Sequence, residues 1–147
     1  MSNPNKAKGT DWERRLTRAF CALGLLATRP HNEGWQDSGD IHGLSPFVGQ
    51  AKNWKSWEDA IREGLDGAER QKAHAGEPFG VAFVKRARRV LGDGYAVMTV
   101  ATFGRMLVRL RRAEELLARD APGAYRYHMG ECLRDHAKPF PRGDAPA

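Results

Sequence analysis

A carboxylate, an amide and an ammonium group are spaced along this sequence so that two short strands would bring them together. Asp40 precedes the turn-forming pair Ser45-Pro46, and Gln50 and Lys52 follow it. Alternate residues of a strand share a face, so Gln50 and Lys52 point the same way, and a turn near Ser45 sets Asp40 opposite Gln50. Oxygen ligands of this kind hold a hard cation, and a nearby lysine can orient or stabilise the attacking group. The pattern predicts a site that could hold a hard cation, with a lysine beside the reacting group.

The residues around this group resemble the PD-(D/E)XK nucleases, and most of all their Holliday junction resolvase branch of archaeal and phage type. The matching stretches are Lys8-Gly9-Thr10-Asp11-Trp12-Glu13-Arg14, Ser38-Gly39-Asp40-Ile41 and Gln50-Ala51-Lys52-Asn53. They occur in the family's order, between about Lys8 and Val100, and depart from it at Gln50, where the family usually has Glu. The resemblance implies an α/β fold, a restriction-endonuclease-like sandwich with a central mixed five-stranded sheet flanked by helices.

The resemblance also implies the roles of individual residues. The catalytic set would be Glu13, Asp40, Gln50 and Lys52. The ligands of Mg²⁺, for which Mn²⁺ would substitute, would be Glu13, Asp40, Gln50 and the backbone carbonyl of Ala51. A neutral Gln50 would bind the cation more weakly than Glu, and Asp37 lies near enough in sequence to compensate.

Two ordinary interpretations compete with these roles. Glu13 also completes a capping box with Thr10, in which its carboxylate would accept the backbone N–H of Thr10. Asp40, Gln50 and Lys52 could be polar positions on a solvated strand face. Both alternatives stay open from the sequence alone.

The charge of the chain predicts a polyanionic partner. The net charge is +6 and the pI is about 9.7. Charge alone does not separate nucleic acid from an acidic membrane surface. The candidate nucleic-acid contacts are Lys8, Ser38, Gln71, Lys85, Arg86, Arg88 and Arg89. Gln71 and the Lys85-Arg86 pair resemble residues of the resolvase branch, with solvated positions as the alternative. Trp54 and Trp57 could stack on bases or pack in the core.

Hydrophobic periodicity and turn residues predict the elements that hold these groups. Helices are predicted over 10–23, 56–75 and 102–119, and strands over 25–28, 39–41, 47–53, 79–84 and 95–100. The third helix would turn Phe103, Met106, Leu107, Leu110 and Leu117 inward. Residues 1–8 are predicted as a flexible basic arm, 9–121 as the nuclease domain and 122–147 as a C-terminal extension, partly disordered.

The sequence thus predicts a magnesium-dependent endodeoxyribonuclease that resolves four-way DNA junctions by paired nicks, and the resemblance implies a homodimer. Two alternatives stay open: another nuclease of the superfamily, acting on flaps, ends or modified DNA, and a nuclease-like DNA-binding module inactivated through Gln50. No apolar run approaches the roughly 18 residues of a membrane-spanning helix. Two cysteines are too few for a disulfide framework, so a cytoplasmic protein is expected.

Overall fold

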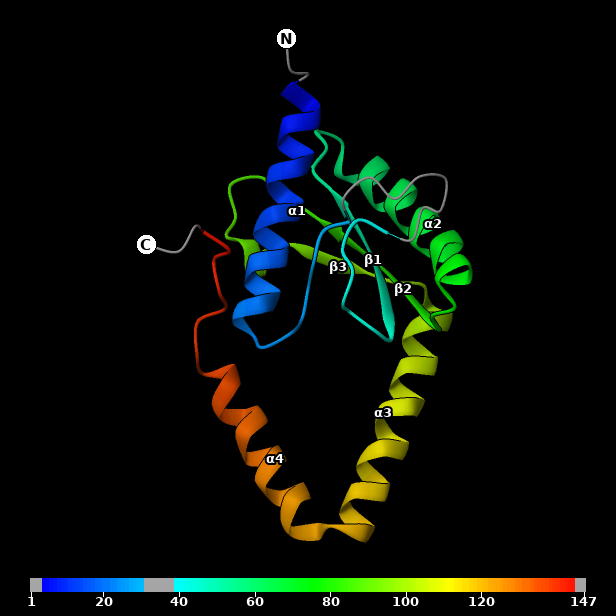
Figure 1. The fold of residues 1–147 in the computed structure, drawn as a ribbon, viewed down its shortest axis with the longest axis vertical. Helices are drawn as coiled ribbons and strands as arrows, with labels where there is room; N and C mark the ends of the chain where they lie inside the picture. The colour runs from blue at the N-terminus through cyan, green and yellow to red at the C-terminus, as the bar shows by residue number, and fades with distance from the viewer. Residues whose placement is uncertain (1–3, 31–38, 145–147) are drawn as a thin grey trace. The chain divides into compact units, whose positions relative to one another are not determined.

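The computed structural model describes residues 4–30 and 39–144 of the chain. In chain order, its elements are α1 (Pro4–Ala22), β1 (Phe47–Lys52), α2 (Trp57–Ala75), β2 (Phe79–Val84), the 3₁₀ helix η1 (Leu91–Asp93), β3 (Tyr95–Val97), α3 (Val100–Asp120) and α4 (Pro122–His136) (Figure 1). The contacts divide the chain into two compact units. One holds the elements from α1 to β3 and the segment that starts at Pro141, and the other holds α3 and α4.

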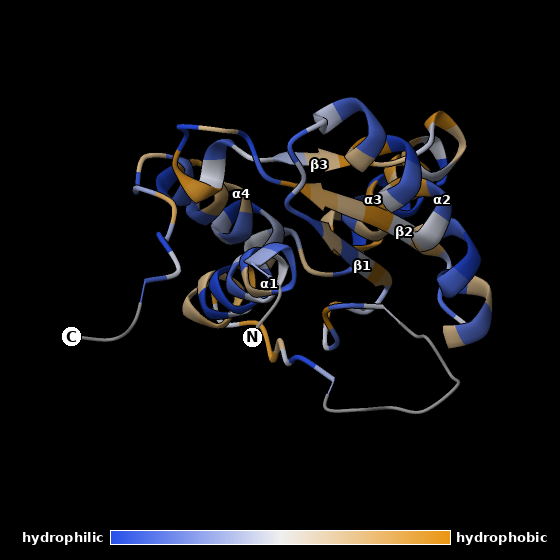
Figure 2. Cartoon of the chain, turned by 90° about the horizontal axis from the view of Figure 1, so that it is seen from above, coloured by the Kyte–Doolittle hydropathy of each residue, from blue (hydrophilic) through white to orange (hydrophobic). Residues whose placement is uncertain are grey.

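The first unit is built on a three-stranded mixed sheet in the order β1-β2-β3. β1 pairs in parallel with β2, with Phe47 opposite Phe79 and Lys52 opposite Val84, and β2 pairs antiparallel with β3. The central strand β2 is coloured orange in Figure 2, which reflects its hydrophobic sequence. A continuous apolar run is typical of a strand that is covered on both faces.

The predicted five-stranded sheet was wrong, because the described residues form only three strands. The segments predicted as two further strands touch their neighbours only through isolated antiparallel bridges. Gly39 and Gly43 both have positive φ, at 109° and 77°, which interrupts the extended backbone that a longer ladder needs. The two bridges join Thr28 to His42 and Ile41 to Gly49.

One helix covers each face of the sheet. α1 packs Trp12 and Leu16 in a cluster with Ala51 of β1. The Trp12 indole Nε1 also donates a hydrogen bond to the backbone carbonyl of Phe83, at 3.0 Å. α2 packs Ala60 against Ala82 on the other face. Because successive strand residues point to opposite faces, the alternation along β1 and β2 decides which helix each side chain meets.

The first residues of α1 and α2 correct one prediction and confirm another. α1 begins at Pro4 rather than Thr10, so residues 4–8 are its first turns instead of a flexible arm. Proline is favoured at the start of a helix, where its missing N–H costs no hydrogen bond. Thr10 therefore lies within the helix, and its capping box with Glu13 does not form. The predicted cap of α2 is confirmed, since the Ser56 hydroxyl accepts the backbone N–H of Asp59 at 3.3 Å.

The second unit, α3 and α4, differs from the sequence prediction. α4 occupies residues predicted as a polar extension, and α3 begins two residues before the predicted Thr102. Thr102 is the only buried residue of the two helices, while Phe103 and Leu110, predicted to point inward, are half exposed. The predicted domain limits stay a prediction. No helix in the described part of the chain is long and apolar enough to cross a membrane.

Candidate active site

Asp40 lies at the edge of β1 that is not paired with β2. The bridge between Ile41 and Gly49 sets Asp40 opposite Gln50, which confirms the register that the sequence predicted. The backbone N–H of Asp40 donates to the Gly49 carbonyl at 2.9 Å, and Oδ2 of its carboxylate accepts the backbone N–H of Ala51 at 2.8 Å. Main-chain hydrogen bonds therefore hold this carboxylate against β1.

Gly39 allows Asp40 to come this close. With φ at 109°, Gly39 has a backbone conformation that other residues rarely adopt. A Cβ atom at this position would lie 2.9 Å from Cγ1 of Val48 and 3.1 Å from the carbonyl oxygen of Gly49. The approach of this segment to β1 therefore requires glycine immediately before Asp40.

Gln50 and Lys52 lie on the face of β1 that α2 covers, and two helix glycines make room for them. A Cβ atom at Gly67 would lie 3.2 Å from Oε1 of Gln50, and one at Gly64 would lie 3.1 Å from Cγ of Lys52. Glycine inside a helix costs about 1 kcal/mol relative to alanine. The space that Gly64 and Gly67 leave for the side chains of Lys52 and Gln50 explains why glycine occupies these two helix positions. Gln50 is buried, so the alternative of a solvated polar position is wrong for this residue.

α1 brings Glu13 to the same edge. Burial raises the pKa of the Glu13 carboxyl above its usual value, and the negative charge of Asp40 raises it further. The charges of Arg29 and Lys52 lower the pKa, but by less. Glu13, Asp40 and Lys52, which come from three separate segments, are therefore close enough to interact electrostatically.

Arg29 is a site residue that the sequence analysis missed. Its Nη2 and Nε donate to Oε2 of Glu13 at 2.9 and 3.3 Å, and both side chains are partly buried. The pair joins α1 to the segment after Thr28, so nothing in the local spacing marks it. Arg29 neutralises the charge of Glu13 and orients its carboxylate.

Gln71 of α2 contributes an amide oxygen. Gln71 is 5% exposed, and its Oε1 is buried without a hydrogen-bond partner among the described residues. A Cβ atom at Gly39 would lie 3.7 Å from this oxygen, so Gln71 lies beside the segment that carries Asp40. An unsatisfied buried acceptor costs about 1–3 kcal/mol, and a bound cation or water would remove that cost.

The oxygen atoms gathered at this site are of the kind that ligate a hard divalent cation. They are the carboxylates of Glu13 and Asp40, the amide oxygens of Gln50 and Gln71, and the carbonyl of Ala51. The Ala51 carbonyl belongs to this set because the N–H and C=O of a strand residue face the same edge. All are oxygens, which Mg²⁺ and Mn²⁺ prefer. Within residues 4–30 and 39–144, no three His, Cys, Asp or Glu side chains form a metal-binding group, so the amides would have to complete the ligand set.

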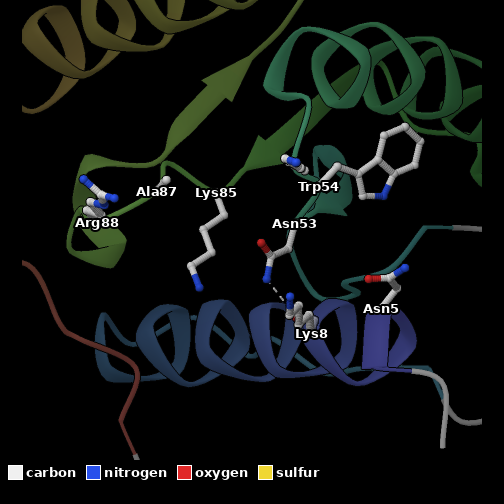
Figure 3. A pocket seen from close by; sticks show the side chains of 8 residues that line it. Asn5, Lys8, Asn53, Trp54, Lys85, Ala87 and Arg88 are labelled. Atoms are coloured by element: carbon white, nitrogen blue, oxygen red, sulfur yellow. Dashed lines mark hydrogen bonds between the residues drawn. The ribbon is translucent and has the colours of Figure 1, made fainter.

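A basic groove of about 820 Å³ adjoins the site (Figure 3). Its lining residues are Asn5, Lys8, Asn53, Trp54, Lys55, Lys85, Ala87 and Arg88. The Asn53 amide donates to the backbone carbonyl of Lys8 at 3.1 Å, and the backbone N–H of Lys85 donates to the Lys52 carbonyl at 3.0 Å. These two bonds tie α1, the end of β1 and the end of β2 together around the groove.

The groove contains three of the predicted nucleic-acid contacts, Lys8, Lys85 and Arg88. Arg86 lies outside it, because its guanidinium is 4.9 Å from the centre of the Tyr95 ring and donates to the Asp93 carbonyl. Arg89 is exposed and also lies outside the described lining of the groove. The prediction missed Lys55, which follows Trp54 in the loop after β1.

The two tryptophans after β1 are half exposed, at 46% for Trp54 and 51% for Trp57, so packing in the core was the wrong alternative for them. All four predicted catalytic residues are described, whereas Asp37 and Ser38 lie outside the described residues. Comparison of the chain with protein-family models, curated proteins and solved structures gave no match.

Proposed function

We propose that this chain is a metal-dependent endodeoxyribonuclease that cuts branched DNA, with four-way junctions as its preferred substrate. The observation that carries the proposal is the meeting of Glu13, Asp40 and Lys52 at one edge of β1. Buried amides from β1 and α2 lie next to them. The resemblance to PD-(D/E)XK nucleases supplies the role of each residue. Support comes from the site and not from the sheet, which has three strands.

In this proposal, the negatively charged side chains bind the cation and the positively charged Lys52 acts on the attacking group or the phosphate. A bound Mg²⁺ or Mn²⁺ supplies polarisation of the scissile phosphate and a lowered pKa for a water molecule. Asp40 would be a ligand whose orientation is fixed by the backbone N–H of Ala51. Lys52 places an ammonium group next to the same edge, where it orients the attacking group or stabilises charge that develops on the phosphate.

Glu13 links cation binding to proton release. Its pKa is raised by burial and by Asp40, so its ionised form is disfavoured when no cation is near. A divalent cation held by Glu13 and Asp40 would favour ionisation of both carboxyls, and Glu13 would then release its proton. Binding of Mg²⁺ should therefore strengthen as the pH rises through the Glu13 pKa.

The junction preference and the homodimer come from the resemblance. A two-fold dimer presents two equivalent sites, which suits a four-way junction cut by paired nicks. A second candidate, a DNA-binding module without catalysis, is favoured by two observations. Gln50 brings no charge to the ligand set, and Arg29 already neutralises Glu13.

A cleavage assay with Mg²⁺ on four-way, flap and linear duplex DNA tests the proposal. Asp40→Asn should slow cleavage by more than about a hundredfold. Mutation of residues that only hydrogen-bond to metal ligands already lowers activity by up to about a hundredfold, and Asp40 is itself a proposed ligand. Junction binding in EDTA should persist, since it depends on the basic residues. Asp66→Asn, the same change at an exposed position of α2, should cleave like the wild type.

Unchanged cleavage by Asp40→Asn would contradict the site assignment. A wild-type protein that binds junctions but cuts none of the three DNAs would favour the inactive module. Equal cleavage of junction and linear duplex, or a monomer in light scattering, would favour a nuclease with another substrate.

A further inference from the structure

The groove beside the site combines positive charge with one exposed aromatic ring. Lys8, Lys55, Lys85 and Arg88 supply four cations, and none of the described lining residues is acidic. Trp54 also lines the groove and is 46% exposed. Cations bind phosphates, and an exposed aromatic ring beside them offers a surface on which a base can stack.

The groove adjoins the candidate site at Lys52. Nζ of Lys52 lies 5.4 Å from the centre of the Trp54 ring, so the proposed catalytic ammonium and the indole are neighbours. The side chain of Lys85 points across the groove toward α1, which carries Lys8 (Figure 3). A strand that passes the site along this groove would therefore meet both Trp54 and the lining cations.

We infer that this groove holds an unpaired DNA strand, with its phosphates against Lys8, Lys85 and Arg88 and one base stacked on Trp54. A base can stack on a side chain only when it is outside the duplex, since the faces of paired bases are covered by their neighbours. Cations alone would serve a duplex equally well, and Trp54 is the feature that selects a single strand. The inference rests on the proposed function and narrows its substrate to DNA that is unpaired next to the scissile phosphate.

Fluorescence anisotropy in EDTA measures this binding without cleavage. The probes are a short fluorescein-labelled oligothymidylate and a labelled duplex of equal length. Trp54→Ala should weaken oligothymidylate binding by on the order of tenfold to a hundredfold, the usual effect of removing one stacking platform. Trp54→Phe should retain most of the affinity. Duplex affinity should change by less than about twofold in both variants, because a paired base does not reach the ring.

Trp57→Ala is the matched control. Trp57 is exposed to a similar degree, but it packs against Tyr95 with ring centres 6.0 Å apart and does not line the groove. It should leave oligothymidylate affinity within about twofold of the wild type. Lys85→Gln should lower the slope of log affinity against log salt by about 0.7, the value for one phosphate contact on a single strand. Circular dichroism verifies the fold of each variant.

Equal losses in Trp54→Ala and Trp57→Ala, or equal weakening for duplex and single strand, would overturn the inference. Its failure is distinguishable from failure of the proposed function. A protein that cuts junctions in Mg²⁺ but binds oligothymidylate independently of Trp54 disproves only the inference. A protein that binds oligothymidylate through Trp54 but cuts no DNA disproves only the nuclease activity.

Discussion

The unit that carries the site and the unit of α3 and α4 contain similar amphipathic helices, but they bury them to very different extents. In the first unit, Trp12 and Leu16 of α1 and Ala60 of α2 are almost fully buried. In the second unit, Thr102 is the only buried side chain, and Leu133 is 70% exposed. A sheet offers one face to each helix, whereas two helices can bury only the stripes that face each other. An amphipathic sequence therefore predicts which face is apolar and not whether anything covers it.

The largest test of this comparison is truncation of the buried indole. Trp12→Ala should lower the free energy of unfolding by about 3–5 kcal/mol, the usual cost of removing a buried aromatic side chain. It also leaves the Phe83 carbonyl without its hydrogen bond from Nε1. Leu133→Ala in α4 should change stability by less than about 0.5 kcal/mol apart from helix propensity. Urea titration followed by circular dichroism measures both, and equal effects would remove the distinction between the units.

A smaller test uses the same substitution in a helix of each unit. Gly104→Ala in α3 should stabilise the protein by up to about 1 kcal/mol, because its new Cβ meets nothing within 4 Å. Gly67→Ala in α2 should lose this gain, since its Cβ would crowd Oε1 of Gln50 at 3.2 Å. The melting temperatures of the two variants make the comparison. A clear stabilisation by Gly67→Ala would mean that Gln50 can move away at no cost.

The smallest expected effect concerns pH, because the units treat carboxyl groups differently. Hydrogen bonds from Arg119 and Lys138 lower the pKa of Asp120 and Asp135, whereas burial raises the pKa of Glu13. A raised pKa gives stability that is complete below the unfolded value, near 4.5, and is lost as pH rises through the folded value. In EDTA, Glu13→Gln should therefore be more stable than the wild type at neutral pH. The difference should disappear below about pH 4.5.

Melting curves of the wild type and of Glu13→Gln across this range would reveal the effect. Glu77→Gln, a change at another partly exposed glutamate of the same unit, is the control. If Glu13→Gln is less stable than the wild type at neutral pH, then its ion pair with Arg29 contributes more than the burial costs.

Much of the fold could be predicted where the signals are local. The bounds of β2, residues 79–84, and the Ser56 cap of α2 follow from an apolar run and from hydrogen bonds within one turn. The length of a strand pairing depends on distant partners, so the predicted five strands became three strands and two bridges. α4 escaped prediction because the polar, proline-containing sequence from Pro122 was interpreted as a C-terminal extension, although proline also starts helices.

In the candidate site, too, the residues set by local spacing could be predicted and those set by distant contacts could not. The spacing of Asp40, Gln50 and Lys52 could be read directly, because one turn fixes their register. Arg29 could not be found, because it reaches Glu13 only where the chain after α1 returns alongside that helix. The groove was only partly predictable, because Lys8, Lys55 and Arg88 are far apart in the sequence and come together through the ends of β1 and β2.

The length of α1 has a consequence for where DNA would be cut. Because the helix begins at Pro4, one continuous segment carries both Lys8 in the groove and Glu13 at the site. The rise of an α-helix separates their positions by about 7.5 Å along its axis. A rigid helix holds this separation constant. The cut would then fall at a fixed number of nucleotides from the base on Trp54, whatever the DNA sequence.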